Sequence, residues 1–288
     1  GARLRRAGFQ AKREREQAGF QTKSDKVSRA GFQEDRSMRN IYFTDGSPEG
    51  FFTAVFDAYA DKDAFVSSSK ALQTALDDRF IAVSPVGEKA QRVVKKLRAV
   101  DKNSLCEIDF ILRTPAADRE QTAFDYIRLL VKQRRPVRGM LVRPEVRRAM
   151  ELVDRVGAER HLLSGFLRFQ ETHNGVFYAP CSPDNDVVDL LMPHFAARFK
   201  TSAFVIHDIS RGLAGIYNGS EWLVSPVAQA EITLSESEDS FSRLWRKYYH
   251  TVYIPARKNT RQMKGYMPVR YWKFMPEKQF EEIDFPET

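Results

Sequence analysis

Residues 203–224, AFVIHDISRGLAGIYNGSEWLV, contain three short apolar runs separated by turn residues. The runs are Ala203–His207, Leu213–Tyr217 and Glu221–Val224, and their length and their β-branched or aromatic content are typical of strands. Asn218-Gly219, between the last two runs, predicts a type I′ hairpin turn. With a further strand predicted at Val176–Ala179, the stretch predicts a small, mainly antiparallel sheet over about residues 175–227.

Outside this sheet, apolar residues recur every three or four positions, which predicts helices. The predicted helices cover about residues 47–59, 88–100, 105–112, 124–131, 144–157, 162–169 and 187–199, the last restarted at Pro193, and further strands are predicted at 41–43 and 79–83. The pattern of residues 61–79 favours no single element. The predicted fold class is α+β, predominantly helical, with the small sheet and a basic, aromatic C-terminal helical region.

Residues 1–37 differ in composition from the rest of the chain. Ala-Gly-Phe-Gln occurs there three times, between charged and Gln-rich spacers. Because few apolar residues remain to offset chain entropy, we predict a disordered leader that is extraneous to the fold, with Met38 as the natural start. The alternative is a set of short docking motifs that present Phe9, Phe20 and Phe32.

The rest of the chain is predicted to form one globular domain over residues 38–274. Its helical part extends to about residue 172, its sheet-containing part covers residues 173–274, and residues 275–288 form a C-terminal tail. The two cysteines, Cys106 and Cys181, are far apart, which excludes a disulfide framework and a cysteine metal site. No apolar run approaches the ~20 residues of a membrane span. We therefore expect a soluble cytoplasmic protein with no membrane partner.

The C-terminal stretch Ser240–Phe274 carries the strongest functional signal. It contains nine Lys or Arg and no Asp or Glu, and aromatic residues are interleaved with the cations. Cations beside flat rings suit a phosphate backbone with bases stacked next to it, so the stretch predicts nucleic-acid binding, whereas its first part is also compatible with an ordinary amphipathic helix whose basic side is solvated. The predicted binding residues are Arg211, Arg243, Arg246, Lys247, Tyr248, Arg257, Lys258, Asn259, Arg261, Arg270, Tyr271 and Trp272.

Signatures of catalysis and cofactor binding are few. The sequence has no Walker A loop, no GxGxxG, no GxSxG, no HExxH and no CxxxCxxC motif, so we expect no cofactor in this chain. The catalytic candidates are His207, as an acid or base, and Asp208, which would orient it. The alternative is a structural histidine that hydrogen-bonds to a turn. Cys181 lacks a base identifiable by spacing.

Several segments together resemble an uncharacterised bacterial family described as DNA metabolism proteins. They are Asp45–Gly50, Phe166–Phe169, Pro193–Phe199, Ile206–Asp208, Ile254–Asn259 and Met267–Trp272, and the resemblance covers about Asn40 to Phe274. Members of that family are encoded beside a radical S-adenosylmethionine protein proposed to modify or repair DNA, and some are fused to a uracil-DNA-glycosylase-like domain. The resemblance implies a role in DNA repair or modification beside such a partner enzyme.

Three hypotheses of function follow. The first is a DNA-binding protein, with single-stranded or damaged DNA as a candidate ligand, whose partner supplies the chemistry. The second is an enzyme that acts on nucleic acid or a nucleotide through His207. The third is a scaffold that docks a partner protein. We also predict that His207, Asn259 and the Arg270-Tyr271-Trp272 run converge on one pocket.

Overall fold

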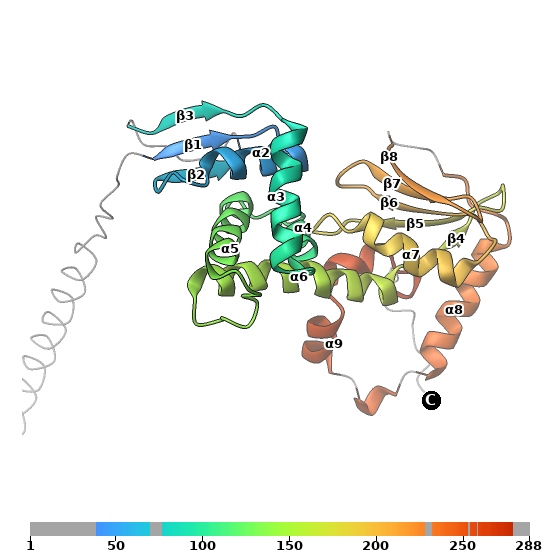
Figure 1. The fold of residues 1–288 in the computed structure, drawn as a ribbon. Coiled ribbons are helices and arrows are strands. Elements are labelled where there is room, and N and C mark those ends of the chain that lie inside the picture. Colours follow the sequence, from blue (N-terminus) through green and yellow to red (C-terminus); the bar gives the residue numbers. More distant parts are fainter. Residues whose placement is uncertain (1–38, 70–76, 228–231, 253, 258, 279–288) are drawn as a thin grey trace, which may run out of the picture.

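The computed structural model describes residues 39–69, 77–227, 232–252, 254–257 and 259–278, so the predicted leader 1–37 and residues 279–288 of the tail lie outside the described residues. The fold is α+β and mostly helical, which confirms the predicted class (Figure 1). It contains a three-stranded sheet near the start of the described chain and a five-stranded sheet near its end, joined through a group of helices.

The first sheet is fully parallel, with β1 (Asn40–Phe43) between β2 (Ala64–Ser67) and β3 (Arg79–Ala82). The helix α2 (Pro48–Ala58) connects β1 to β2 and begins as its sequence predicts. Ser47 is its N-cap, and the Ser47 hydroxyl accepts a bond from the Gly50 amide at 3.0 Å. The strand β2 lies in the segment whose pattern favoured no element, because a parallel partner is distant in sequence and leaves no hairpin signal.

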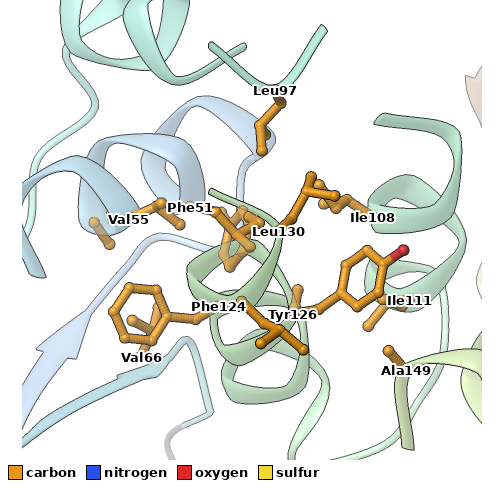
Figure 2. Close-up of a cluster of buried hydrophobic side chains, with 14 of the residues drawn as sticks. Phe51, Val55, Val66, Leu97, Ile108, Ile111, Phe124, Tyr126, Leu130 and Ala149 are labelled. Atoms are coloured by element: carbon orange, nitrogen blue, oxygen red, sulfur yellow. The ribbon is translucent and has the colours of Figure 1, made fainter. Parts of the chain in front are cut away.

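Four helices follow, namely α3 (Gly87–Val100), α4 (Ser104–Leu112), α5 (Arg119–Gln133) and α6 (Pro144–Phe166). They pack against α2 and the parallel sheet around a core that includes Phe51, Leu97, Phe124 and Tyr126 (Figure 2). The prediction of two helices over 144–157 and 162–169 is wrong, because α6 runs through Gly157 without a break. A glycine inside a helix costs only about 1 kcal/mol, which buried side chains on both sides offset.

The second sheet has the order β4-β5-β6-β7-β8, with β4 (Gln170–Glu171), β5 (Phe177–Cys181), β6 (Phe204–Asp208), β7 (Leu213–Tyr217) and β8 (Trp222–Pro226). The helix α7 (Val188–Phe199) connects β5 to β6, and this pair is parallel, whereas the other pairings are antiparallel. The sheet is therefore mainly antiparallel, as predicted. The expected restart at Pro193 is wrong, since α7 is continuous through it.

The predicted type I′ turn at Asn218-Gly219 is also wrong, because Asn218 has no positive φ. The hairpin instead closes through the Asn218 side chain, which accepts bonds from the amides of Ser220 and Glu221 at 2.9 Å. Gly219 has φ +99° and lies so close to the Thr201 carbonyl that a Cβ would come within 2.5 Å of its oxygen.

The long helix α6 belongs to two apolar cores. Its Met150 and Val153 pack in the core of the first sheet and helices, and its Val156 and Leu163 pack in the core of the five-stranded sheet and α7. Consecutive turns of one helix thus join the two halves of the described chain (Figure 1).

The C-terminal region consists of α8 (Glu238–Val252), the 3-10 turn η1 (Pro255–Arg257), α9 (Thr260–Tyr266), η2 (Val269–Phe274) and η3 (Pro276–Lys278). It confirms the predicted basic helical region. Within the described ranges, no helix combines the length and the apolar character that crossing a membrane requires.

Candidate nucleic-acid interface

A basic arch is formed by α8, η1 and α9, which lead away from the five-stranded sheet and back toward α6 (Figure 1). Four of its cations are exposed and have side chains that form no hydrogen bond or ion pair within the described chain: Lys247, Arg257, Arg261 and Lys264. Because the arch carries no acid after Asp239, its positive charge is uncompensated along most of its length. Such a surface attracts polyanions.

Two further predicted cations bond within α8. Arg243 donates to the Ser240 hydroxyl at 3.3 Å, and Arg246 donates to the Ser242 carbonyl at 2.9 Å. The Arg243 bond leaves guanidinium N–H groups with capacity for another acceptor, since a guanidinium has five donors. Lys258, also predicted to contact phosphate, lies outside the described residues.

Aromatic rings accompany the cations of the arch. Tyr248 is 58% exposed and Tyr266 is 71% exposed, so both rings are accessible to a stacking base. The predicted residue Asn259 has a local role, because its side chain accepts a bond from the Gln262 amide at 3.0 Å and caps α9. A cap of this kind fixes where α9 begins and hence where Arg261 and Lys264 lie.

Arg270 and Tyr271 are held by a buried carboxylate. The Tyr271 hydroxyl donates to Glu159 of α6 at 2.8 Å, and Arg270 donates to the same oxygen at 2.9 Å. The Tyr271 ring is only 2% exposed, and a second N–H of Arg270 pairs with Asp184 at 2.9 Å. These two residues therefore anchor η2 to α6, and this geometry gives no support to their predicted contacts with nucleic acid.

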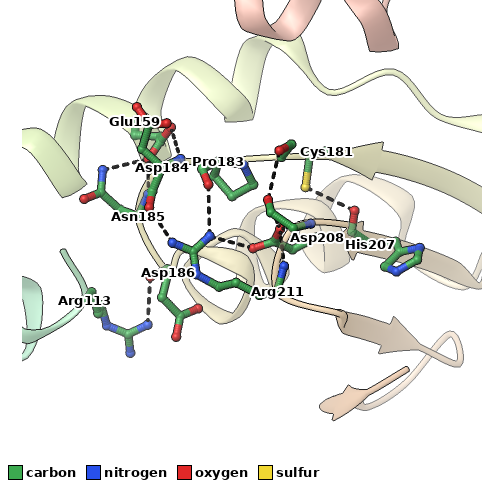
Figure 3. Close-up of polar contacts among 12 residues, drawn as sticks. Arg113, Glu159, Cys181, Pro183, Asp184, Asn185, Asp186, His207, Asp208 and Arg211 are labelled. Atoms are coloured by element: carbon green, nitrogen blue, oxygen red, sulfur yellow. Dashed lines mark hydrogen bonds and ion pairs between the residues drawn. The ribbon is translucent and has the colours of Figure 1, made fainter. Parts of the chain in front are cut away.

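Glu159 itself organises a wider site (Figure 3). Its carboxylate also accepts bonds from the amides of Asp184 and Asn185, at 3.0 and 2.7 Å, and from the Asn185 side chain at 2.7 Å. Burial raises the pKa of Glu159, but these donors and the Tyr271 hydroxyl outweigh that effect and lower the pKa below its ordinary value. The ionised form thus ties the loop before α7 to η2.

Trp272 is half-buried beside the end of the described chain. Its indole N–H donates to the Met267 carbonyl at 3.1 Å, and the Lys278 ammonium lies 5.4 Å from its ring centroid. The ring is thus already in contact with a cation of this chain. Trp272 belongs with Tyr271 to the anchor of η2 rather than to the arch.

Asp208 and Arg211 form a second structural site. The Asp208 carboxylate is fully buried, accepts from the Ser210 amide at 3.0 Å and pairs with Arg211 at 2.8 Å (Figure 3). Arg211 also donates to the Pro183 carbonyl at 2.9 Å and to that of Asp184. Arg211 and Arg270 therefore hold the same loop from two sides, and the charge of each is shared with carboxylates.

His207 lies on β6 and is 8% exposed. Its Nδ1 is 2.8 Å from the Tyr178 hydroxyl on the neighbouring strand β5, and no bond joins its ring to Asp208 within the described geometry. Figure 3 shows the two side chains directed differently. The arrangement matches a structural histidine more closely than an acid/base pair oriented by Asp208.

The predicted convergence of His207, Asn259 and the 270–272 run on one pocket does not appear in the described geometry. His207 bonds to Tyr178, Asn259 caps α9 and Arg270 pairs with Glu159, so each has a separate partner. Among the predicted cations of the arch, Lys247, Arg257 and Arg261 are exposed, and their contact with nucleic acid stays a prediction. The sequence prediction missed Lys264 and Tyr266, although Arg261 and Lys264 have the i, i+3 spacing that places two side chains on one helix face.

A cleft of about 810 Å³ lies between the two halves of the described chain, beside the start of α2. The charges that line it are balanced: Arg98, Arg113, Arg119 and Arg211 face Asp109, Glu120, Asp186 and Asp189. Arg113, for example, is paired with both Asp109 and Asp189. The cleft therefore lacks the uncompensated charge of the arch.

Cys181 is buried, and this gives a simple prediction. Burial, with a further contribution from Asp208, raises the pKa of its thiol, while Cys106 is exposed. A thiol reagent at neutral pH should therefore modify one cysteine of the native chain quickly, and mass spectrometry should identify it as Cys106. In urea both should react. Rapid labelling of Cys181 in the folded protein would contradict the buried position.

The described residues contain no group of three or more His, Cys, Asp or Glu side chains placed to hold a metal ion. Among known families, the one described as "Domain of unknown function (DUF4130)" matches residues 117–277. The matched part runs from just before α5 to η3, so it includes Glu159, the five-stranded sheet and the basic arch but not the parallel sheet. No curated protein matches the chain.

Proposed function

The chain belongs to the family described as a domain of unknown function, DUF4130, and we propose that it binds nucleic acid through the basic arch. The observation that carries the proposal is the set of exposed cations without carboxylate partners among the described residues, Lys247, Arg257, Arg261 and Lys264. Some surface arginines elsewhere, such as Arg148 and Arg155, are paired with acids. Exposed cations without an ion pair also occur elsewhere, for example Lys95 and Lys96 on α3, but in the arch they stand beside exposed rings in a stretch of sequence without acids.

The rings of the arch favour a ligand with accessible bases. Tyr248 and Tyr266 are exposed beside the cations, and a tyrosine ring can stack on any base that is not already paired within a duplex. Single-stranded or locally opened DNA therefore fits the arch better than an intact duplex, whose bases are stacked on each other.

We further propose that the chain acts in DNA repair or modification together with a partner enzyme. This role is supported by the resemblance of the six segments named above to DNA metabolism proteins encoded beside a radical S-adenosylmethionine protein or fused to a uracil-DNA-glycosylase-like domain. In this proposal the partner performs the chemistry, and the arch holds the strand. No catalytic step is assigned to His207, because its ring is nearly buried and bonded to Tyr178.

The salt dependence of binding tests the proposal. If the four exposed cations each neutralise one phosphate, the plot of log affinity against log salt concentration should have a slope of about −3 for a single strand. Fluorescence anisotropy with a labelled 20-base oligonucleotide, and with the matching duplex, at several salt concentrations would measure it. A flat dependence, or no binding at low salt, would sink the proposal.

A further inference from the structure

The apolar face of α8 is largely uncovered. Phe241 is 59% exposed, Leu244 is 62% exposed, and Trp245 and Val252 are also exposed. These residues follow the three- and four-residue spacing of one helix face. A contiguous apolar face of this size on a helix is normally covered by another segment or a partner.

An aromatic groove lies under this face. It has a volume of about 1020 Å³, and its other wall is built from the end of α6, β4, β5 and α7. Phe169, Phe195 and Phe199 pack together there, with ring centroids 4.9 and 4.6 Å apart. The groove thus offers an apolar floor as well as the exposed side chains of α8.

The described chain ends beside this groove. Pro276 lines it, and Arg168, which pairs with Glu277 at 2.7 Å, lies 5.5 Å from the Trp245 ring centroid. Lys278 donates to the Tyr249 hydroxyl of α8 at 2.6 Å. The next residue of the chain therefore starts within reach of α8.

Residues 279–288, QFEEIDFPET, have a composition that complements α8. They carry the apolar side chains of Phe280, Ile283 and Phe285, and four carboxylates with no Lys or Arg. The exposed Arg198 of α7 lines the groove and offers the opposite charge, whereas the exposed Arg243 and Lys247 lie on the other face of α8. Ten extended residues reach about 33 Å, and a fifteen-residue helix is about 22 Å long, so the segment can follow the whole of α8.

We propose that residues 279–288 dock in cis on the apolar face of α8 and fill the aromatic groove. Phe280, Ile283 and Phe285 supply the apolar contacts, and the carboxylates lie near Arg198 at the wall of the groove. The docking stands on the groove and the charge pattern alone. Its consequence, which rests on the proposed function, is that these carboxylates lower the positive potential of the neighbouring arch and so weaken its binding of phosphate.

Truncation after Lys278 tests the docking. The truncated chain should show a red-shifted Trp245 emission, assigned by comparison with Trp245→Phe versions of both chains because the sequence holds three tryptophans. A synthetic peptide of residues 279–288 should restore the emission. A peptide with Phe280, Ile283 and Phe285 replaced by serine is the matched control and should not. Far-UV circular dichroism verifies that the truncated chain is folded.

DNA affinity tests the consequence. If the peptide binds in trans with a Kd on the order of 100 µM, an effective concentration near 1 mM in cis should make the truncated chain bind a single strand more tightly, by up to about 10-fold. Docking without any DNA binding would contradict the proposed function but not the docking. Unchanged Trp245 emission with no peptide binding would overturn the docking, as would emission of the full chain that depends on protein concentration, because a second copy would then cover α8.

Discussion

Glu159→Gln should lower the free energy of unfolding by about 3 kcal/mol, a large effect for the replacement of one carboxylate by an amide. The wild-type carboxylate accepts bonds from Asp184, Asn185, Tyr271 and Arg270 in a nearly dry site. A glutamine offers one acceptor oxygen, and its amide group would point N–H donors at donors. Urea unfolding followed by far-UV circular dichroism would measure the difference.

Glu151→Gln is the matched control, because Glu151 lies on the same helix and also accepts from two residues, Arg148 and Arg155. Its carboxylate is about half exposed, so water screens both pairs and the expected loss of stability is much smaller than for Glu159→Gln. Equal losses of unfolding free energy for the two variants would show that burial does not strengthen the interactions of Glu159.

The Glu159 effect should also depend on pH. Because the folded pKa of Glu159 is below its ordinary value, its contribution to stability is complete at neutral pH and disappears as the pH falls from about 4.5 through the folded pKa. The stability difference between wild type and Glu159→Gln should therefore shrink under acid. A difference that stays constant down to pH 3 would contradict an ionised carboxylate in this site.

The sequence predicted those parts of the fold that depend on local patterns. The strand Leu213–Tyr217 and the start of α2 at Pro48 were predicted at their observed positions, because alternation and capping are properties of neighbouring residues. The parallel strand β2 and the unbroken helix α6 were not predicted, because both depend on packing against distant segments. Gly157 is an example. The tendency of glycine to interrupt a helix can be read from the local sequence, whereas the distant buried side chains that stabilise α6 on both sides of Gly157 cannot.

For the candidate site, the sequence indicated unpaired cations only where the surrounding stretch contains no acids. Lys247, Arg257 and Arg261 lie in a stretch without carboxylates, so no nearby acid could neutralise them. Arg270 lies in the same stretch, yet its partner Glu159 is 111 residues earlier in the chain. Nothing in the pattern around Arg270 identifies that contact, and so a cation that looked available in the sequence is paired with a buried carboxylate.

Replacement of Arg257, Arg261 and Lys264 by glutamine should weaken binding of a single-stranded oligonucleotide about 100-fold at 50 mM salt. Each lost phosphate contact removes about 0.7 from the slope of log affinity against log salt, so the triple variant should also lose about 2 from that slope. Fold stability should be almost unchanged, because these three side chains are exposed and form no ion pair with a described residue. Anisotropy titrations and a thermal melt would report the two quantities.

The control that makes this result specific is a triple variant with the same change in net charge elsewhere. Lys95, Lys96 and Arg98 on α3 are likewise exposed and are found in no ion pair between described residues. If binding depends on the arch, their replacement by glutamine should change affinity less than about 3-fold and leave the slope intact. If both triple variants lose affinity equally, net charge alone attracts the strand. The arch would then not be a specific binding surface, even though its rings are exposed.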